Sequence, residues 1–160
     1  GILIVQGNAD SRACVRLSGA KVILAGEITQ PIQEAIGNPG TYANLKGFAC
    51  EYMTSGTVII MGDPGPYAFS GMTGGVVYQK LTPEFGFDLP ALQRRIAKGA
   101  QVRIESIHED DLWEIRSLMN HYLTALEQTY QYDTAERLRL FLQDDALVLH
   151  RFVKIIPTPQ

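Results

Sequence analysis

The sequence predicts a mainly β fold of the solenoid class, a parallel β-helix, followed by a helical C-terminal part. In the first half, a glycine, four or five mostly apolar β-forming residues and a second glycine recur, as in residues 18–26 and 55–62. The flanking glycines keep a spacing: Gly7 and Gly26 are 19 residues apart, and so are Gly56 and Gly75. A fixed period near 20 residues is typical of stacked repeat units.

The glycine density supports this interpretation. Thirteen of the 15 glycines lie in the first eighty residues. Each one costs about 0.5–1 kcal/mol inside a strand, so we expect them at corners that need a positive φ or a close backbone approach. A coil of ~18 extended residues, at about 3.3 Å per residue, would form three short sides and stack at roughly 4.8 Å on the next coil.

The glycines also allow two other interpretations. A phosphate-binding loop at Gly62-Asp63-Pro64-Gly65 needs a helix behind the glycines, and a P-loop needs a Lys-Ser/Thr pair, but Pro66 and another glycine-rich run follow. Antiparallel hairpins of a β-sandwich also carry dense turn signals, and they remain the alternative fold.

Composition limits the function classes. The 160 residues carry a net charge of −3, and the sequence pI near 5.6 gives no electrostatic reason to expect nucleic acid or an anionic membrane as partner. No apolar run is long enough to span a bilayer, and no signal peptide is visible. Cys14 and Cys50 are too few for a disulfide framework, an iron–sulfur cluster or a structural zinc site. We expect two small buried thiols in a reducing, cytoplasmic setting.

The chain divides near its middle. Residues 1–80 hold 10 charged side chains and residues 81–160 hold 21. Pro83 and Gly86 interrupt the strand pattern, so we expect a β-helical part over 1–82 and a helical lid or tail over 83–160 that packs on it.

The second half predicts three helices and two extended segments. Asp88 is expected to cap a short helix that runs to about Lys98, and residues 101–107 alternate as a strand does. Ser106 and Glu109 have the form of a capping box for a helix with one apolar stripe. Its members are Leu112, Ile115, Met119, Tyr122 and Leu126.

A second helical pattern follows, with Asp133 and Glu136 as its expected cap, and it continues to about His150. We expect the two long helices to form an antiparallel hairpin that covers an open end of the β-helix. Residues 151–157 are expected to form an extended arm that Pro157 ends.

The ionisable clusters favour structural roles. The run His108-Glu109-Asp110-Asp111 starts a helix, where side chains diverge and acidic groups complement the helix dipole, so capping is favoured over metal binding. Glu51 and Tyr52 would serve acid–base chemistry or hydrogen-bond a neighbouring coil. Cys14 as a nucleophile would need a distant base such as His108.

One basic cluster is apparent in the second half. It contains Arg94, Arg95, Lys98 and Arg103, and it is interpreted as a solvated face, with a docking patch for an acidic partner as the alternative.

The central stretch resembles a known family. Cys50-Glu51-Tyr52-Met53-Thr54-Ser55-Gly56 and Gly71-Met72-Thr73-Gly74-Gly75, with Gly62, Gly65, Ala68 and Tyr78, are similar to the C-terminal glycine-repeat (GXGXG) domain of the glutamate synthase large chain. The closing Arg151-Phe152-Val153-Lys154 with Pro157 is similar to the end of that chain. Residues 28–48 depart from the family pattern. A more distant resemblance is to the β-helical subunit of formylmethanofuran dehydrogenase.

The resemblance implies a right-handed β-helix that is a non-catalytic structural domain or subunit. In that family an amidotransferase domain hydrolyses glutamine, and ammonia passes through a tunnel to a synthase domain with FMN and an iron–sulfur cluster, which makes glutamate from 2-oxoglutarate. No cofactor is expected on this chain, and those two domains are its expected partners. The resemblance implies corner roles for Gly56, Gly62, Gly65, Gly71, Gly74 and Gly75, and the upstream repeat extends them to Gly19 and Gly26.

Two rival functions stay open. A stand-alone β-helical binding protein would carry an exposed aromatic or polar ladder on one face. An independent enzyme would need an ionisable cluster in a cleft, and Glu51, Tyr52 and His108 are its candidate residues.

Overall fold

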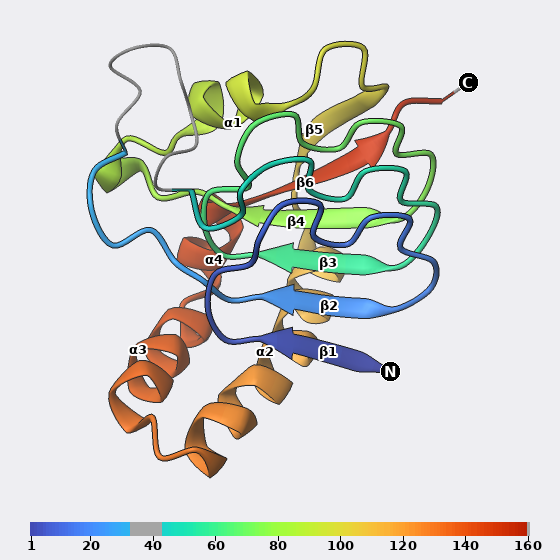
Figure 1. The fold of residues 1–160 in the computed structure, drawn as a ribbon. Helices are drawn as coiled ribbons and strands as arrows, with labels where there is room; N and C mark the ends of the chain where they lie inside the picture. The colour runs from blue at the N-terminus through green and yellow to red at the C-terminus, as the bar shows by residue number, and fades with distance from the viewer. Residues whose placement is uncertain (33–42, 160) are drawn as a thin grey trace.

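The computed structural model describes residues 1–32 and 43–159, and it shows one mixed six-stranded sheet with a layer of chain on each face (Figure 1). Spatially the strands run in the order β1-β2-β3-β4-β6-β5. The first four are parallel, whereas β6 is antiparallel to both of its neighbours. The strands are β1 (Ile2–Val5), β2 (Lys21–Leu24), β3 (Thr57–Ile60), β4 (Val76–Lys80), β5 (Val102–Ser106) and β6 (Phe152–Pro157).

The prediction of a right-handed parallel β-helix is wrong. The chain has an α/β fold, in which each glycine period contributes one strand to a mixed sheet instead of three sides of a solenoid coil. Between the parallel strands, the described residues form turns and isolated bridges such as Ala9 with Leu45. The reason is conformational: these segments repeatedly enter the left-handed region, which an extended side of a coil cannot contain.

The period itself reappears as strand register. Lys21 pairs with Thr57, and Thr57 pairs with Val76, so equivalent positions of successive periods lie side by side. β3 is buried at every position, and β2 at all but its first. Continuous β-branched runs such as Val58–Ile60 are what a parallel sheet covered on both faces requires.

The connecting turns are stacked like the strands that they join. Three equivalent positions in each turn have φ near +60°, and the turns bond through their backbones: the Cys50 amide donates to Ala13 O at 2.8 Å, and the Phe69 amide donates to Ala49 O at 2.8 Å. Successive turns therefore form ladders of left-handed residues. The ladders are Arg12/Phe48/Tyr67, Cys14/Cys50/Phe69 and Arg16/Tyr52/Gly71.

Three helices cover one face of the sheet, and α1 lies with the turns on the other (Figure 1). Ile23, Ile59 and Tyr78 belong to the core under the helices, while Val22 and Val58 face the turns and α1. The apolar stripe predicted from Leu112 to Leu126 is buried at all five positions. The helices are α1 (Leu89–Arg95), α2 (Glu109–Gln128), α3 (Tyr132–Gln143) and α4 (Asp145–Arg151), with a 3-10 turn at Pro83–Phe85. Among the described residues, none of the helices has the length and apolar content that crossing a membrane requires.

Tertiary contacts move several predicted helix ends. Asp88 caps α1 as expected, but the helix stops at Arg95 because Ile96 pairs with Ala68 of a turn. Ser106 is part of β5, so α2 begins after His108, whose amide donates to Asp111 Oδ2 at 2.9 Å.

The second helical pattern also differs from its prediction. α3 begins at Tyr132 without a side-chain cap, so the expected cap at Asp133 and Glu136 is wrong. The helix predicted to reach His150 is broken at Asp144, whose Oδ1 accepts from the Leu147 amide and starts α4. Of the segment 28–48 that departs from the family pattern, residues 33–42 lie outside the described part of the chain.

Candidate functional site

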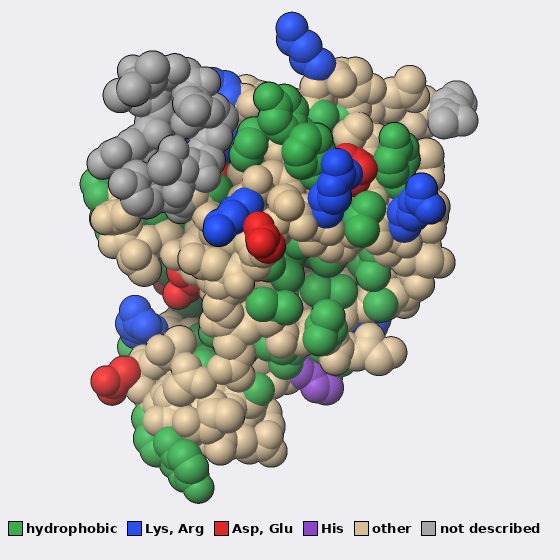
Figure 2. Space-filling view, viewed as in Figure 1, with side chains coloured by type: hydrophobic (Ala, Val, Ile, Leu, Met, Phe, Trp, Pro, Cys, Tyr) green, Lys and Arg blue, Asp and Glu red, His purple; other side chains and the backbone are tan. Residues whose placement is uncertain are grey.

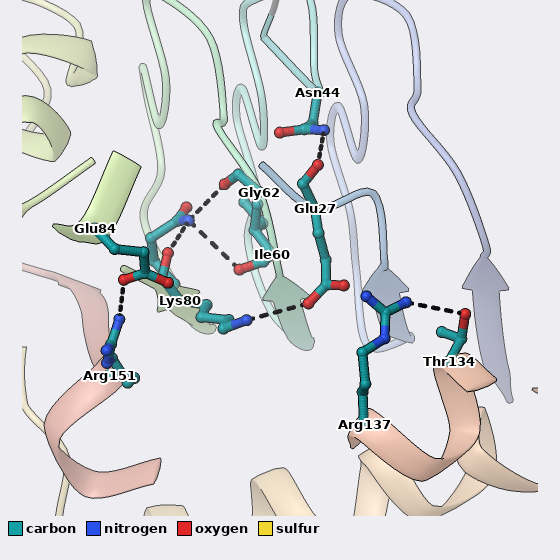
Figure 3. A network of polar contacts seen from close by, with 10 residues as sticks. Glu27, Asn44, Ile60, Gly62, Lys80, Glu84, Thr134, Arg137 and Arg151 are labelled. Atoms are coloured by element: carbon teal, nitrogen blue, oxygen red, sulfur yellow. Dashed lines mark hydrogen bonds and ion pairs between the residues drawn. The ribbon is translucent and has the colours of Figure 1, made fainter. Parts of the chain in front are cut away.

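Polar side chains gather where the parallel strands end. Asn8 and Asp63 each follow a strand by three residues, and Asn44 lies between them. The Asn44 amide nitrogen donates to Glu27 O at 3.0 Å (Figure 3) and to Asn8 Oδ1 at 2.8 Å. Asn44 Oδ1 accepts from the Asp63 backbone amide at 2.8 Å. This strand-end network links three stacked chain segments.

An ion pair closes the strand-end network. Arg95 Nε and Nη2 each donate to an Asp63 carboxylate oxygen at 2.9 Å, and both side chains are buried. Burial raises the pKa of Asp63 to about 6, against the lowering effect of the Gly65 amide, and burial lowers the pKa of Arg95 to about 10. Both groups stay charged at neutral pH, so each depends on the other for compensation.

The interpretation of Arg95 as part of a solvated basic face is therefore wrong. Arg95 follows Ala91 and Leu92 at helical spacing, and both of those residues are buried. Arg95 therefore lies on the apolar stripe of the short helix, and Arg94 does not. This spacing is the signal in the sequence that distinguishes the two arginines.

A cavity of about 220 Å³ opens beside this network, between the strand ends and α3. We call it the strand-end cavity. Lys80, the last residue of β4, pairs with Glu27 Oε1 at 3.1 Å, and its ammonium lies 5.1 Å from the centre of the Phe141 ring. The other lining residues are Met61, Tyr122, Thr134, Arg137 and Leu138.

The buried Gln79 amide holds the wall behind Lys80. Its nitrogen donates to Gly62 O at 2.7 Å, to Lys80 O at 2.9 Å and to Ile60 O at 3.4 Å (Figure 3). The ends of β3 and β4 are thus tied together at the edge of the cavity.

A second polar cluster lies where α2 meets the sheet. The Tyr78 hydroxyl donates to Asp111 Oδ1 at 2.9 Å, and Lys154 pairs with Asp111 Oδ2 at 3.0 Å. Burial raises the pKa of Asp111, but the His108 amide and Lys154 hold it below its ordinary value; burial and the carboxylates hold the pKa of Tyr78 far above its ordinary range. In this cluster the charge of Lys154 compensates that of Asp111, and the Tyr78 hydroxyl has an acceptor, so the polar groups join α2 to the sheet.

The predicted functional candidates do not form one site. Glu51 Oε1 pairs with Arg12 at 2.7 Å on the turn side of the sheet, and Tyr52 is half exposed beside it. His108 precedes α2, on the helix side. The sheet separates these groups. Among the described residues, no group of three or more His, Cys, Asp or Glu side chains is arranged to hold a metal ion.

The eight predicted corner glycines occupy two kinds of position. Gly19, Gly56, Gly65, Gly71 and Gly75 have positive φ. Gly26, Gly62 and Gly74 do not, but an added Cβ would lie under 3.0 Å from atoms of a neighbouring segment, at 2.0 Å from Thr54 O in the case of Gly74. At each of these three glycines a neighbouring segment therefore approaches too closely for any side chain.

The two cysteines lie together. Cys14 and Cys50 occupy equivalent positions of adjacent turns, with φ of 60° and 55°, and their thiols share a hydrogen bond. That bond lowers the pKa of Cys14 although burial raises it, and the same bond and burial raise the pKa of Cys50. Cys50 is buried as predicted, whereas Cys14 is only partly buried, and the prediction of two separate core thiols did not include their contact.

We expect oxidised glutathione to cross-link the pair. Stacked segments lie about 4.8 Å apart, which is within disulfide reach. The Cys14 thiolate attacks glutathione disulfide and releases one glutathione, and Cys50 then displaces the second and closes the bond. Mass spectrometry should show the loss of two hydrogen atoms and a Cys14–Cys50 linked peptide. Cys14→Ser should stay uncross-linked, and a wild-type chain that accumulates only the glutathione adduct would contradict the expected proximity.

Fold and site together define an α/β domain with stacked glycine turns, whose buried polar residues hold neighbouring turns, strands and helices to one another. The GXGXG motif family model matches residues 1–158, and the chain belongs to this family. The resemblance to the glycine-repeat domain of the glutamate synthase large chain is thereby confirmed.

Curated relatives carry glutamate synthase names. The chain is 28% identical over 158 residues to the glutamate synthase [NADPH] large chain of Bacillus subtilis, covering 98% of this chain and 8% of the relative. It is 28% identical over 137 residues to the ferredoxin-dependent glutamate synthase of Pyropia yezoensis, and this alignment covers 82% of this chain and 8% of the relative. It is 30% identical over 112 residues to ferredoxin-dependent glutamate synthase 2, chloroplastic, of Arabidopsis thaliana, and this alignment covers 67% of this chain and 6% of the relative. The chain thus spans less than a tenth of these relatives' length.

The residues of this chain do not fit the iron–sulfur cluster that the resemblance implies for a partner domain. Such a cluster takes four thiolates in its common form, and the sequence contains two cysteines.

Proposed function

We propose that this chain is a non-catalytic organising domain of a glutamate-synthase-type enzyme. It would hold an amidotransferase domain and a synthase domain in register for ammonia transfer. FMN and the iron–sulfur cluster would lie on the synthase partner, and we place the assembly in the cytoplasm. The internal compensation of Asp63 with Arg95, and of Asp111 with Lys154, supports a structural role for the described polar groups.

The observation that carries the proposal is the exposed apolar surface of the turns and the sheet edge. Tyr52 and Tyr67 are 51% and 57% exposed on stacked turns, and Leu3 of the edge strand β1 is 58% exposed. Figure 2 shows apolar side chains gathered on this face among scattered charged ones. Exposed apolar patches of this kind favour a docking surface for other domains.

The ladder of left-handed residues Arg12, Phe48 and Tyr67 gives this surface a fixed shape. Phe48 stacks on Tyr67 with ring centroids 5.1 Å apart, and the Arg12 guanidinium lies 4.8 Å from the Phe48 ring centroid. Rigid aromatic and arginine side chains are the residue types that contribute most at protein interfaces. We use the name turn face for the surface formed by Arg12, Phe48, Tyr52 and Tyr67.

Affinity purification of the tagged protein from its own cells, followed by mass spectrometry, tests the proposal. We expect amidotransferase and flavin-containing synthase segments at near-equal stoichiometry, either as bound polypeptides or as continuous parts of the same chain. If they are separate polypeptides, Tyr67→Glu should reduce their recovery at least about tenfold.

Tyr130→Glu is the matched control, because Tyr130 is also an exposed tyrosine with φ near +60° but lies after α2. It should leave recovery unchanged. Isolation of a folded chain with neither kind of segment would refute the organising role, and equal losses in both variants would show that the turn face is not the docking surface.

A further inference from the structure

The described lining of the strand-end cavity contains one more positive than negative side chain. Lys80 is paired with Glu27, but Arg137 has no carboxylate partner among the described residues. The Arg137 guanidinium donates to Thr134 Oγ1 at 3.2 Å, and its side chain reaches from α3 toward the strand ends beside Glu27 (Figure 3). Arg137 is exposed at the rim of the cavity, so solvent is what compensates its charge within the described part of the chain.

The same cavity has a hydroxyl donor and an apolar wall. Burial and the Glu27 carboxylate raise the pKa of Tyr122, while Arg137 lowers it, so this phenol lies within electrostatic reach of both charges and stays protonated at neutral pH. Met61, Leu138 and Phe141 supply the apolar part of the lining. The lining of the cavity thus contains both charged and apolar side chains.

The position in the fold is also that of a ligand site. The strand-end cavity lies at the carboxyl ends of parallel strands, beside β4, where the sheet changes from parallel to antiparallel pairing. In open α/β sheets, ligands bind in the crevice outside the carboxyl ends of the strands. A helix closes the cavity from the other side, as in many small-molecule sites.

We propose that the strand-end cavity binds a small monocarboxylate with a short uncharged tail. Its carboxylate accepts from the Arg137 fork and from the hydroxyls of Tyr122 and Thr134, and its tail packs on Phe141. Phosphate has no tail to pack on Phe141, so the site favours the monocarboxylate. A cavity of 220 Å³ equals the liquid volume of about seven water molecules, which suits a ligand of roughly that many non-hydrogen atoms.

Calorimetric titration of the whole chain with butanoate tests this site. We expect saturable binding with a Kd of about 1 mM or lower, which weakens as sodium chloride is raised. Butanamide has the same shape without the charge and should not bind at these concentrations. Inorganic phosphate should bind more weakly than butanoate.

Two arginine variants on α3 make the test specific. Arg137→Gln should weaken butanoate binding by about tenfold or more. Arg139→Gln is the matched control, because Arg139 is outside the cavity lining and pairs with Glu127 and Glu136; its Kd should equal that of the wild type. Both variants should keep the wild-type circular dichroism spectrum.

Three outcomes would overturn the site. They are the absence of saturable butanoate binding up to about 10 mM, equal binding of butanoate and butanamide, and equal affinities of Arg137→Gln and wild type. None of these outcomes concerns the turn face, so this test and the test of the organising role are independent of each other.

Discussion

Gly56→Ala is expected to destabilise the domain by more than ~2 kcal/mol. Gly56 has a φ of +105°, and an added Cβ would lie 2.4 Å from Ala20 O in the neighbouring segment. Backbone strain and a backbone clash therefore act together at one residue. The free energy of unfolding, measured by urea denaturation at constant m-value, is the readout.

Three other glycines separate the two contributions. Gly74→Ala would bring Cβ to 2.0 Å from Thr54 O without a positive φ, whereas Gly99→Ala has a φ of +80° and open space around the Cβ. At Gly7 an added Cβ would meet no atom of the described residues, and φ is not positive. We expect losses above ~2 kcal/mol at Gly74, about 1–2 kcal/mol at Gly99, and no loss at Gly7. A Gly74→Ala protein as stable as Gly7→Ala would contradict the close packing of the turns.

Arg95→Met is expected to cost about 3–5 kcal/mol of unfolding free energy, because it leaves the Asp63 carboxylate buried without its cation. Asp63→Asn should destabilise as well, since it leaves the guanidinium uncompensated. The double variant should cost less than the sum of the two single changes, because neither charge remains.

Arg103→Met serves as the control for losing an arginine ion pair. Arg103 pairs with Glu105 at 3.1 Å, but the two side chains are 45% and 38% exposed. An exposed pair of this kind contributes 0 to about 1 kcal/mol. If the Arg95 and Asp63 changes were strictly additive, the argument for a mutually dependent buried pair would fail.

Local sequence patterns predicted most elements of the second half. The spacing from Leu112 to Leu126 identified the buried stripe of α2, and Asp88 identified the start of α1. These signals depend on neighbours three or four residues away, so the sequence contains them directly. The errors at Ser106 and Asp144 arose where a strand partner or a new cap ended a pattern that periodicity alone would continue.

The glycine period predicted which segments are equivalent but not what lies between them. It placed the parallel strands in register, yet the same spacing suits both extended sides and compact left-handed turns. Which of the two conformations forms depends on backbone hydrogen bonds between turns, such as that from the Cys50 amide to Ala13 O, and these bonds join residues far apart in the chain. The predicted β-helix failed at this point.

The sequence by itself determined the family, the strand-forming runs and the helical stripe, because each depends on residue identities at short fixed spacings. Only the tertiary structure decided that Arg95 is buried against Asp63, that Cys14 lies beside Cys50, and that Arg137 of α3 faces the end of β4 at Lys80. Those contacts join segments about 30 to 60 residues apart, and their energies depend on burial and on distances that exist only after the sheet has brought its strand ends together.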